Sequence, residues 1–219
     1  MFTGIVEHVA PILAIEPRGA AYRFRLDLGP VAEGLKIGDS VACDGACLTV
    51  VTLEGQLAEF DVIRETVERT AFKQLQVGGG INVERPMRAD GRFHGHLVSG
   101  HVDGTGEIVV KREEDGQTWL TVQVAPELAA FCVEKGSITL SGVSLTLTAV
   151  EERRVSVALI PHTLEVTTLG QRREGELLNI EVDQLAKLVH RLISPYLPEG
   201  ASGLDLDVLK RAGWGQQAD

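Results

Sequence analysis

The chain has 219 residues, of which 44% are hydrophobic and 24% are charged, a composition typical of a globular protein. Its net charge of −10 argues against nucleic acid and against an anionic membrane surface as partners, because both favour an excess of Lys and Arg. No stretch reaches the roughly 18 apolar residues of a membrane span, and the first residues lack a secretion signal. We therefore expect a cytoplasmic protein that binds small molecules.

The chain contains few candidates for a disulfide or a metal site. The three cysteines, Cys43, Cys47 and Cys132, are an odd number without a C-x-x-C pair. His94 and His96 would share one face of a strand, but no carboxylate or thiolate stands at ligand spacing beside them. The sequence therefore predicts free thiols and no metal ion.

An internal repeat organises the whole chain. The segment G-A-C-L-T-V at residues 45–50 returns as G-V-S-L-T-L at residues 142–147, after 97 positions. The same offset pairs further residues: Ser40 with Ser137, Thr66 with Thr163, Asn82 with Asn179 and Glu84 with Glu181. A period this long indicates a duplicated domain rather than a solenoid. We predict two homologous domains, residues 1–94 and 95–183, followed by a helix and tail at residues 184–219.

Short apolar runs separated by Gly and Pro predict strands in both halves. From residue 9 to residue 28 the runs are short, and residues 22–28 alternate strictly between apolar and polar. A single helical turn within 31–37 precedes predicted strands at 40–43, 46–53, 59–63 and 80–84. The second half repeats them at 137–141, 143–148, 155–160 and 177–182. About six strands per half indicate an all-β fold of two closed, six-stranded antiparallel barrels of Greek-key type.

Small polar residues follow a two-residue period in the repeated strand. Ser144 and Thr146 should therefore lie on one side of their strand, and Cys47 and Thr49 on the matching side of theirs. These positions form a row of hydroxyl and thiol groups that faces away from the aliphatic residues.

After Asp183, a plausible N-cap, the apolar period changes to 3.6 and predicts a helix. One stripe holds its apolar residues: Leu185, Leu188, Val189, Leu192, Ile193 and Tyr196. The helix could pack on a barrel, or copies from several subunits could bundle together, and we favour the bundle. A second short helix is expected at 204–212.

Four segments carry a resemblance to a known family. They are M-F-T-G-I-V-E at 1–7, D-G-A-C-L-T-V at 44–50, H-L-V-S-G-H-V-D-G at 96–104 and D-L-D-V-L-K at 205–210. In this order and spacing they resemble the riboflavin synthases of the α-chain type, which have two lumazine-binding repeats. The resemblance covers residues 1 to about 212. It departs from the family at Asp44, where Asn is expected at a turn.

The resemblance implies a dismutation without cofactor or metal. Two molecules of 6,7-dimethyl-8-ribityllumazine would exchange a four-carbon unit, giving riboflavin and 5-amino-6-(D-ribitylamino)uracil. It also implies a homotrimer held by C-terminal helices, with two lumazines in each site, between the N-barrel of one subunit and the C-barrel of the next. Whether the trimer joins lumazine synthase, and which barrel holds the four-carbon donor, stay open.

Carried over residue by residue, the resemblance places two lumazines. One would be held by Gly4, Ile5, Val6, Ser144, Leu145, Thr146, Ala158, Leu159, Ile160, Pro161, His162 and Thr163. The other would be held by Cys47, Leu48, Thr49, Asp61, Val62, Ile63, Arg64, Glu65, Thr66, Gly100, His101, Val102 and a neighbouring subunit's Lys135. Phe2 and Thr3 would form a wall with a hydrogen-bonding edge. Candidates for proton transfer or for positioning a nucleophile are Ser40, Cys47, His101, Ser144 and Thr146, with Asp183 as an orienting carboxylate.

Other interpretations remain. Cys47 could be a small buried hydrophobe, His101 a turn residue, and Thr49 and Thr146 simple strand formers. The whole protein could be a lumazine carrier without turnover, a flavin-dependent oxidoreductase barrel or a structural trimer. A G-x-G-x-x-G nicotinamide motif is absent from the sequence, and a structural trimer leaves the hydroxyl row unexplained. The sequence favours the enzyme.

Overall fold

The structure is a computed structural model that describes residues 1–114 and 116–194. Residues 1–183 form one compact unit, which contains two β-barrels, and helix α4 (Gln184–Ile193) belongs to a second unit. Tyr196 and the short helix expected at 204–212 lie outside the described residues. No helix in the described ranges is long and apolar enough to cross a membrane.

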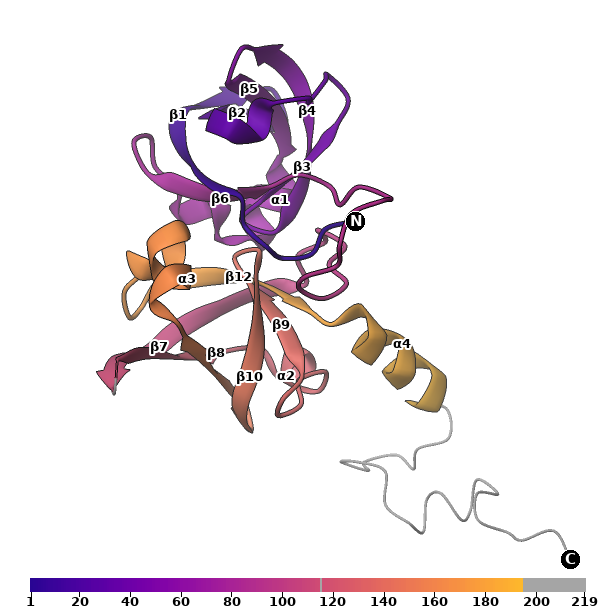
Figure 1. Ribbon diagram of the computed structural model, residues 1–219, viewed down its shortest axis with the longest axis vertical. Coiled ribbons are helices and arrows are strands. Elements are labelled where there is room, and N and C mark those ends of the chain that lie inside the picture. The colour runs from indigo at the N-terminus through magenta and orange to yellow at the C-terminus, as the bar shows by residue number, and fades with distance from the viewer. Residues whose placement is uncertain (115, 195–219) are drawn as a thin grey trace, which may run out of the picture. The chain divides into compact units, whose positions relative to one another are not determined.

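Six strands form the first barrel, shown in indigo and violet in Figure 1. They are β1 (His8–Arg18), β2 (Ala21–Asp27), β3 (Ser40–Cys43), β4 (Ala46–Glu54), β5 (Leu57–Ile63) and β6 (Gly80–Glu84). They close in the order β1-β2-β5-β4-β3-β6, and every neighbouring pair is antiparallel. Short helices turn the corners: η1 (Gly29–Ala32), α1 (Arg64–Arg69) and η2 (Ala71–Gln74). The helical turn expected within 31–37 begins two residues earlier, at Gly29.

The second barrel has the same topology. Its strands are β7 (Gly104–Glu114), β8 (Gln117–Gln123), β9 (Ser137–Leu140), β10 (Val143–Glu151), β11 (Arg154–Leu159) and β12 (Leu177–Val182). They close in the order β10-β11-β8-β7-β12-β9, which matches the first barrel around the ring. The helices α2 (Pro126–Ala129), α3 (Pro161–Val166) and η3 (Thr168–Gly170) complete it. The predicted pair of six-stranded antiparallel barrels is confirmed.

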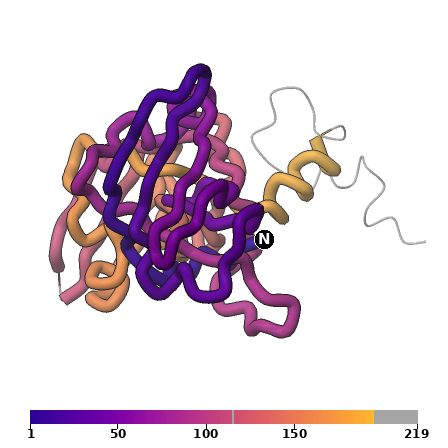
Figure 2. Tube along the Cα trace, turned by 90° about the horizontal axis from the view of Figure 1, so that it is seen from above, coloured from indigo at the N-terminus to yellow at the C-terminus, as the bar shows by residue number. Residues whose placement is uncertain are grey.

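Each barrel encloses its own apolar core. Alternation along the strands sends every second side chain inward, as Phe24 and Leu26 do from β2 and Val155 and Val157 from β11. Figure 2 looks along the direction in which the barrels are stacked and shows the first barrel in front of the second. A closed barrel has no free sheet edge, so each half can bury its core with few residues.

A reciprocal pair of asparagines joins the barrels. The Asn82 amide nitrogen donates to the Ser141 carbonyl at 2.9 Å, and its amide oxygen accepts from the Thr168 nitrogen at 2.8 Å. Asn179, its partner in the repeat, makes the equivalent bonds to the first barrel. Its amide nitrogen donates to the Asp44 carbonyl at 2.8 Å, and its amide oxygen accepts from the Ala71 nitrogen at 2.7 Å. Buried main-chain groups that the strands leave unpaired are thereby satisfied across the interface.

The turn before β4 is also part of this interface. Asp44, which the sequence placed at a turn, has φ of 42° and is fully buried. Its Oδ1 accepts from the Asn82 nitrogen at 2.9 Å, and its Oδ2 lies 3.4 Å from Nη2 of Arg172. Burial raises the pKa of Asp44 to about 6, although the positive charge of Arg172 opposes this shift.

Candidate functional site

The hydroxyl and thiol row lies on the outside of the barrels. On β4, Cys47 is half-buried and Thr49 is exposed, whereas Ala46, Leu48 and Val50, which alternate with them, are buried in the core. On β10, Ser144 and Thr146 take the same places. The prediction that these residues share one face of their strands is confirmed, and the face is the outer one.

Neighbouring strands extend this face into two equivalent patches. β4 pairs with β5, and β10 pairs with β11. The N-terminal half-site is the outer patch of Cys47, Thr49, Asp61 and Ile63. The C-terminal half-site is the outer patch of Ser144, Thr146, Ala158 and Ile160. Ile63 and Ile160, partners in the repeat, are each 57% exposed, so both patches carry an uncovered apolar side chain.

Some predicted binding residues point away from these patches. Leu48, Val62 and Leu159 are buried among the core residues, so they can offer a ligand only their main-chain groups. Leu145 is partly buried and packs against the second core.

Two segments outside the barrels cross between the half-sites. The amino-terminal segment (residues 1–7) pairs with the linker segment (residues 95–103) through an antiparallel bridge between Phe2 and Val98. The Gly4 carbonyl accepts from the Ser144 nitrogen, and the Gly100 carbonyl accepts from the Cys47 nitrogen, both at 2.7 Å. The amino-terminal segment therefore lies beside β10 of the second barrel, and the linker segment lies beside β4 of the first barrel.

Glycine is required at both crossing points. Gly4 has φ of 75° and Gly100 has φ of 81°. A Cβ atom at either position would lie 2.7 Å from the Cβ of Ser144 or Cys47, respectively. Both the backbone conformation and the close approach exclude a side chain.

Apolar contacts show that each segment also packs against the barrel of the opposite half. Val6, from the amino-terminal segment, packs against the core of the second barrel, and Val102 packs against the core of the first. Phe2 is buried against Val98, with Cys47 beside them. Phe2, Thr3, Gly4, Cys47, Gly100 and Ser144, all predicted site residues, are brought together in this way.

His96 is a site residue that the sequence analysis considered only as a metal ligand. Its Nδ1 lies 2.8 Å from the Ser144 hydroxyl, and its buried Nε2 has no hydrogen-bond partner among the described residues. Burial lowers the pKa of His96, and the negative charge of Asp183 opposes this shift. His96 is therefore neutral at neutral pH, and one of its two ring nitrogens can accept a proton.

The shared strand face expected for His94 and His96 is wrong. Apart from the bridge at Val98, residues 91–103 form no strand, and His94 is exposed while His96 is buried. In the described ranges, no group of three or more His, Cys, Asp or Glu side chains is arranged to hold a metal ion. The signal that could have identified His96 is its position at the start of the H-L-V-S-G-H motif.

A cavity of about 610 Å³ gathers three predicted residues at the N-terminal half. Thr3, Ile5 and Ser40 line it together with Glu84 and residues of the loop between Arg85 and His94. Ser40 pairs with Thr49 across β3 and β4, which places the cavity beside the outer strand face.

Several predicted residues have partners of their own. The Asp61 carboxylate binds Nε and Nη2 of Arg23 at 2.6 and 2.9 Å, and this pairing lowers the pKa of Asp61. His101 is exposed, and its main-chain nitrogen donates to the Ser99 hydroxyl at 3.2 Å.

The remaining predicted residues lie at strand and helix ends. Arg64, Glu65 and Thr66 form the first turn of α1, and Pro161, His162 and Thr163 form the first turn of α3. Exposed Lys135 has φ of 64° and donates its main-chain nitrogen to the Leu147 carbonyl at 2.8 Å. A contribution of Lys135 to a neighbouring subunit's site stays a prediction.

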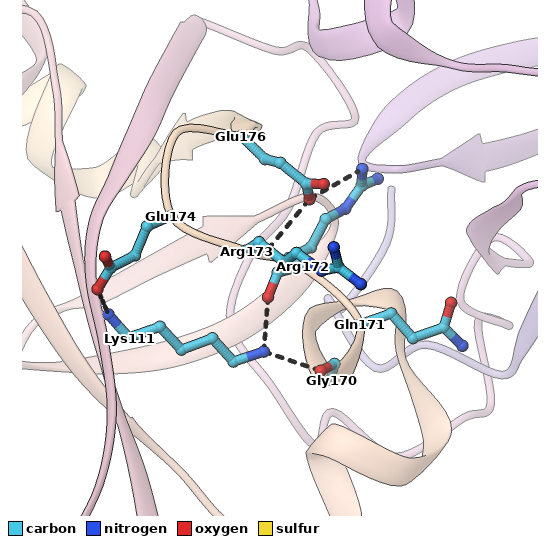
Figure 3. A pocket seen from close by; sticks show the side chains of 7 residues that line it. All are labelled: Lys111, Gly170, Gln171, Arg172, Arg173, Glu174 and Glu176. Carbon is cyan, nitrogen blue, oxygen red and sulfur yellow. Dashed lines mark hydrogen bonds and ion pairs between the residues drawn. The ribbon is translucent and has the colours of Figure 1, made fainter.

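A larger cavity of about 910 Å³ lies beside β7 and the loop at residues 170–176 (Figure 3). The Lys111 ammonium group donates to the carbonyl oxygens of Leu169, Gly170 and Arg172 at 3.0, 2.8 and 2.7 Å. These bonds use all three of its donors, so the lysine fastens the loop rather than offering a free charge. None of the predicted site residues lines this cavity.

Comparisons with known proteins agree with this architecture. The family described as the lumazine binding domain matches residues 3–86 and 99–183. A riboflavin synthase from Actinobacillus pleuropneumoniae is 39% identical over 215 residues, covering 98% of this chain and 100% of that protein. One from Photobacterium phosphoreum is 40% identical over 220 residues, covering 98% of this chain and 99% of that protein. One from Bacillus subtilis is 39% identical over 193 residues, covering 88% and 90%.

Solved structures resemble the barrels. LumP complexed with riboflavin has a TM-score of 0.77 at 23% identity, and LumP complexed with 6,7-dimethyl-8-(1'-D-ribityl) lumazine has 0.75 at 22%. Each match covers 83% of this chain and 99% of LumP, and at this identity it shows a shared fold. Since both halves match the lumazine binding domain and the relatives align over nearly the whole chain, this protein belongs to the riboflavin synthase family.

Proposed function

We propose that this chain catalyses the last step of riboflavin biosynthesis. Two molecules of 6,7-dimethyl-8-ribityllumazine react, one giving a four-carbon unit to the other, and the products are riboflavin and 5-amino-6-(D-ribitylamino)uracil. The observation that carries the proposal is the pair of equivalent outer patches on β4–β5 and β10–β11. A reaction between two identical molecules needs two similar binding sites, and a duplicated barrel supplies them.

Each half-site would hold one lumazine, so the enzyme would gain much of its rate from proximity. Holding two reactants in a reactive geometry can lower a barrier by about 7–11 kcal/mol in favourable cases. Glycine at positions 4 and 100 lets the crossing segments lie against β10 and β4, beside the positions where the planar ring systems would bind. Leu48, Val62 and Leu159 would take part through their main chain.

Proton transfer is the remaining task. The C7 methyl group of one lumazine must lose a proton, and a nucleophile must add at C7 of the other. Ser144 is well suited to handle a proton, because neutral His96 lies 2.8 Å from its hydroxyl. Cys47 would be its counterpart at the N-terminal half-site. Ser40, His101 and Thr146 would bind or polarise the substrates, and Asp183 would orient His96 through its charge.

We further propose that the working protein is a trimer, with domains at residues 1–94 and 95–183 and an assembly segment at 184–219. Helix α4 supports this, because Leu185, Leu188, Val189 and Leu192 are all exposed. So do the exposed Ile63 and Ile160, which a bound ligand or a neighbouring barrel would cover. Three free cysteines fit a reducing compartment such as the cytoplasm. Association with lumazine synthase stays a prediction.

The decisive experiment mixes the purified chain with 6,7-dimethyl-8-ribityllumazine and a chelator, without added cofactor. Riboflavin should appear at half the molar amount of lumazine consumed, measured by absorbance and fluorescence. Tight binding without riboflavin would instead identify a lumazine carrier. Turnover that the chelator abolishes would show a metal requirement and contradict the proposed mechanism.

A further inference from the structure

Two buried carboxylates hold the crossing segments. Glu84, at the end of β6, is 5% exposed, and Glu181, its repeat partner on β12, is 1% exposed. Glu84 accepts hydrogen bonds from the nitrogen and hydroxyl of Thr3, both at 2.7 Å, and from the Gly4 nitrogen at 3.0 Å. Its two oxygens thus fix two consecutive residues of the amino-terminal segment.

Glu181 makes the same three bonds to the linker segment. It accepts from the nitrogen and hydroxyl of Ser99 at 2.6 and 2.7 Å, and from the Gly100 nitrogen at 3.0 Å. A buried carboxylate is costly unless several donors satisfy it, so two such arrangements with the same geometry are a built feature of the fold. In the sequence, Glu84 and Glu181 stand out only as a repeated pair.

The two carboxylates reach across the molecule. Glu84 belongs to the first barrel, yet the Gly4 that it holds pairs with Ser144 of the second barrel. Glu181 belongs to the second barrel, yet the Gly100 that it holds pairs with Cys47 of the first. The position of each half-site's central residue therefore depends on a carboxylate in the opposite barrel.

We propose that Glu84 and Glu181 are positioning residues that act crosswise, Glu84 on the C-terminal half-site and Glu181 on the N-terminal half-site. Neither carboxylate needs to contact a lumazine, because each acts through the main chain of a glycine. The link to catalysis rests on the proposed function, whereas the crosswise coupling of the two barrels stands on the hydrogen bonds alone.

Glutamine substitutions test the coupling. In E84Q the amide oxygen can still accept from Thr3, but the NH2 group faces the Gly4 N–H, so two donors meet. The same conflict arises at Gly100 in E181Q. Each change should let one glycine move away from its strand. Turnover should then fall on the order of 10²-fold, the effect of a displacement of about 1 Å at a reacting centre.

The crosswise effect can be measured without turnover, from the labelling rate of a single reactive thiol that is placed at one half-site or at the other. The wild-type chain has the half-buried thiol of Cys47, while Cys43 and Cys132 are buried. The double variant C47S/S144C moves the reactive thiol to the C-terminal half-site. Labelling by iodoacetamide would be followed in both backgrounds, each combined with E84Q or with E181Q.

E181Q should accelerate labelling of Cys47 about tenfold, the change expected from loss of one hydrogen bond to a charged group. E84Q should do the same for the thiol introduced by S144C. Each glutamine should have the smaller effect at the half-site of its own barrel. E174Q is the control, because Glu174 is an exposed carboxylate that accepts a single main-chain bond, from the Lys111 nitrogen at 2.8 Å.

Equal acceleration at both thiols by both glutamine variants would overturn the crosswise assignment, because it would indicate general loosening. A larger acceleration of labelling at the half-site of the substituted glutamate's own barrel would also overturn it. If either glutamine variant fails to fold, T3A and S99A remove only the side-chain donor to Glu84 or Glu181 and should give the same pattern with smaller changes. Crosswise labelling without riboflavin formation by the wild type would refute the proposed function and leave the coupling intact.

Discussion

The two barrels share their framework and differ in the groups that they present. Asn82 and Asn179, and likewise Glu84 and Glu181, make matching hydrogen bonds in the two halves. On the outer face of the half-sites, Thr49 matches Thr146 and Ile63 matches Ile160, but the other two pairs of residues differ. The duplication thus keeps these groups that hold main chain, whereas part of the face exposed to a ligand has diverged.

Three differences distinguish the half-sites. Cys47 stands where the C-terminal half has Ser144, and the described structure gives only Ser144 a histidine on its side chain, at 2.8 Å. Asp61 carries a charge paired with Arg23, whereas its repeat partner is Ala158. The N-terminal half-site thus carries an ion pair and a thiol, and the C-terminal one has Ala158 and a hydroxyl–imidazole pair. Two identical lumazines would meet different surroundings, as donor and acceptor must.

The largest effect is expected at the crossing glycines. Gly4→Ala and Gly100→Ala each introduce a Cβ 2.7 Å from a neighbouring Cβ at positive φ. Either change should reduce turnover by about 10²-fold or more, because the segment must leave its strand. Gly78→Ala is the matched control: its φ is 86°, but a Cβ there meets nothing within 4 Å. Comparable loss of kcat in the control would attribute the effect to backbone strain rather than to the crossing.

Exchanging the central residues tests whether the half-sites differ chemically. Cys47→Ser should reduce turnover by about 10²-fold while lumazine binding changes little, since a thiol and a hydroxyl differ in proton affinity but hardly in size. His101→Gln should likewise lower kcat more than affinity. Steady-state kinetics and fluorescence titration separate the two quantities. An equal loss of binding and turnover in both variants would argue against a chemical role for either side chain.

Asp44 offers a smaller effect on stability. Its pKa of about 6 in the fold exceeds its ordinary value of 3.8, so the folded state holds its proton over a range where the unfolded state has lost it. This contribution favours folding below pH 4 and declines by about 3 kcal/mol as the pH rises through 6. Its repeat partner, Ser141, does not titrate in this range.

Asp44→Asn should remove that decline. Chemical denaturation between pH 4 and pH 8 would compare its free energy of unfolding with that of the wild type. Asp90→Asn is the control, because Asp90 is an exposed carboxylate paired with Arg88 at 2.9 Å. If the wild type and Asp44→Asn keep the same slope with pH, the buried Asp44 carboxyl is not the group that titrates.

The candidate site could be predicted in part. The family resemblance named Phe2, Gly4, Cys47, Gly100 and Ser144 as site residues, and the repeat showed that Cys47 and Ser144 occupy equivalent positions. They missed His96, whose partner Ser144 is 48 residues away, and the roles of both glutamates. The offset of 97 marked Glu84 and Glu181 as equivalent without indicating what they bind.

The sequence by itself determined the number of barrels, most strand positions and the face on which Cys47, Thr49, Ser144 and Thr146 lie. These properties follow from local periodicity, since side chains alternate across a strand. The tertiary structure decided that this face is the outer one, that Asp44 is buried and that the two segments cross. The crossing depends on hydrogen bonds between residues 80 or more positions apart, as between Glu84 and Thr3 or Gly4, and no local pattern encodes those partners. The burial of Asp44 also depends on residues distant in the sequence, Asn82 and Arg172.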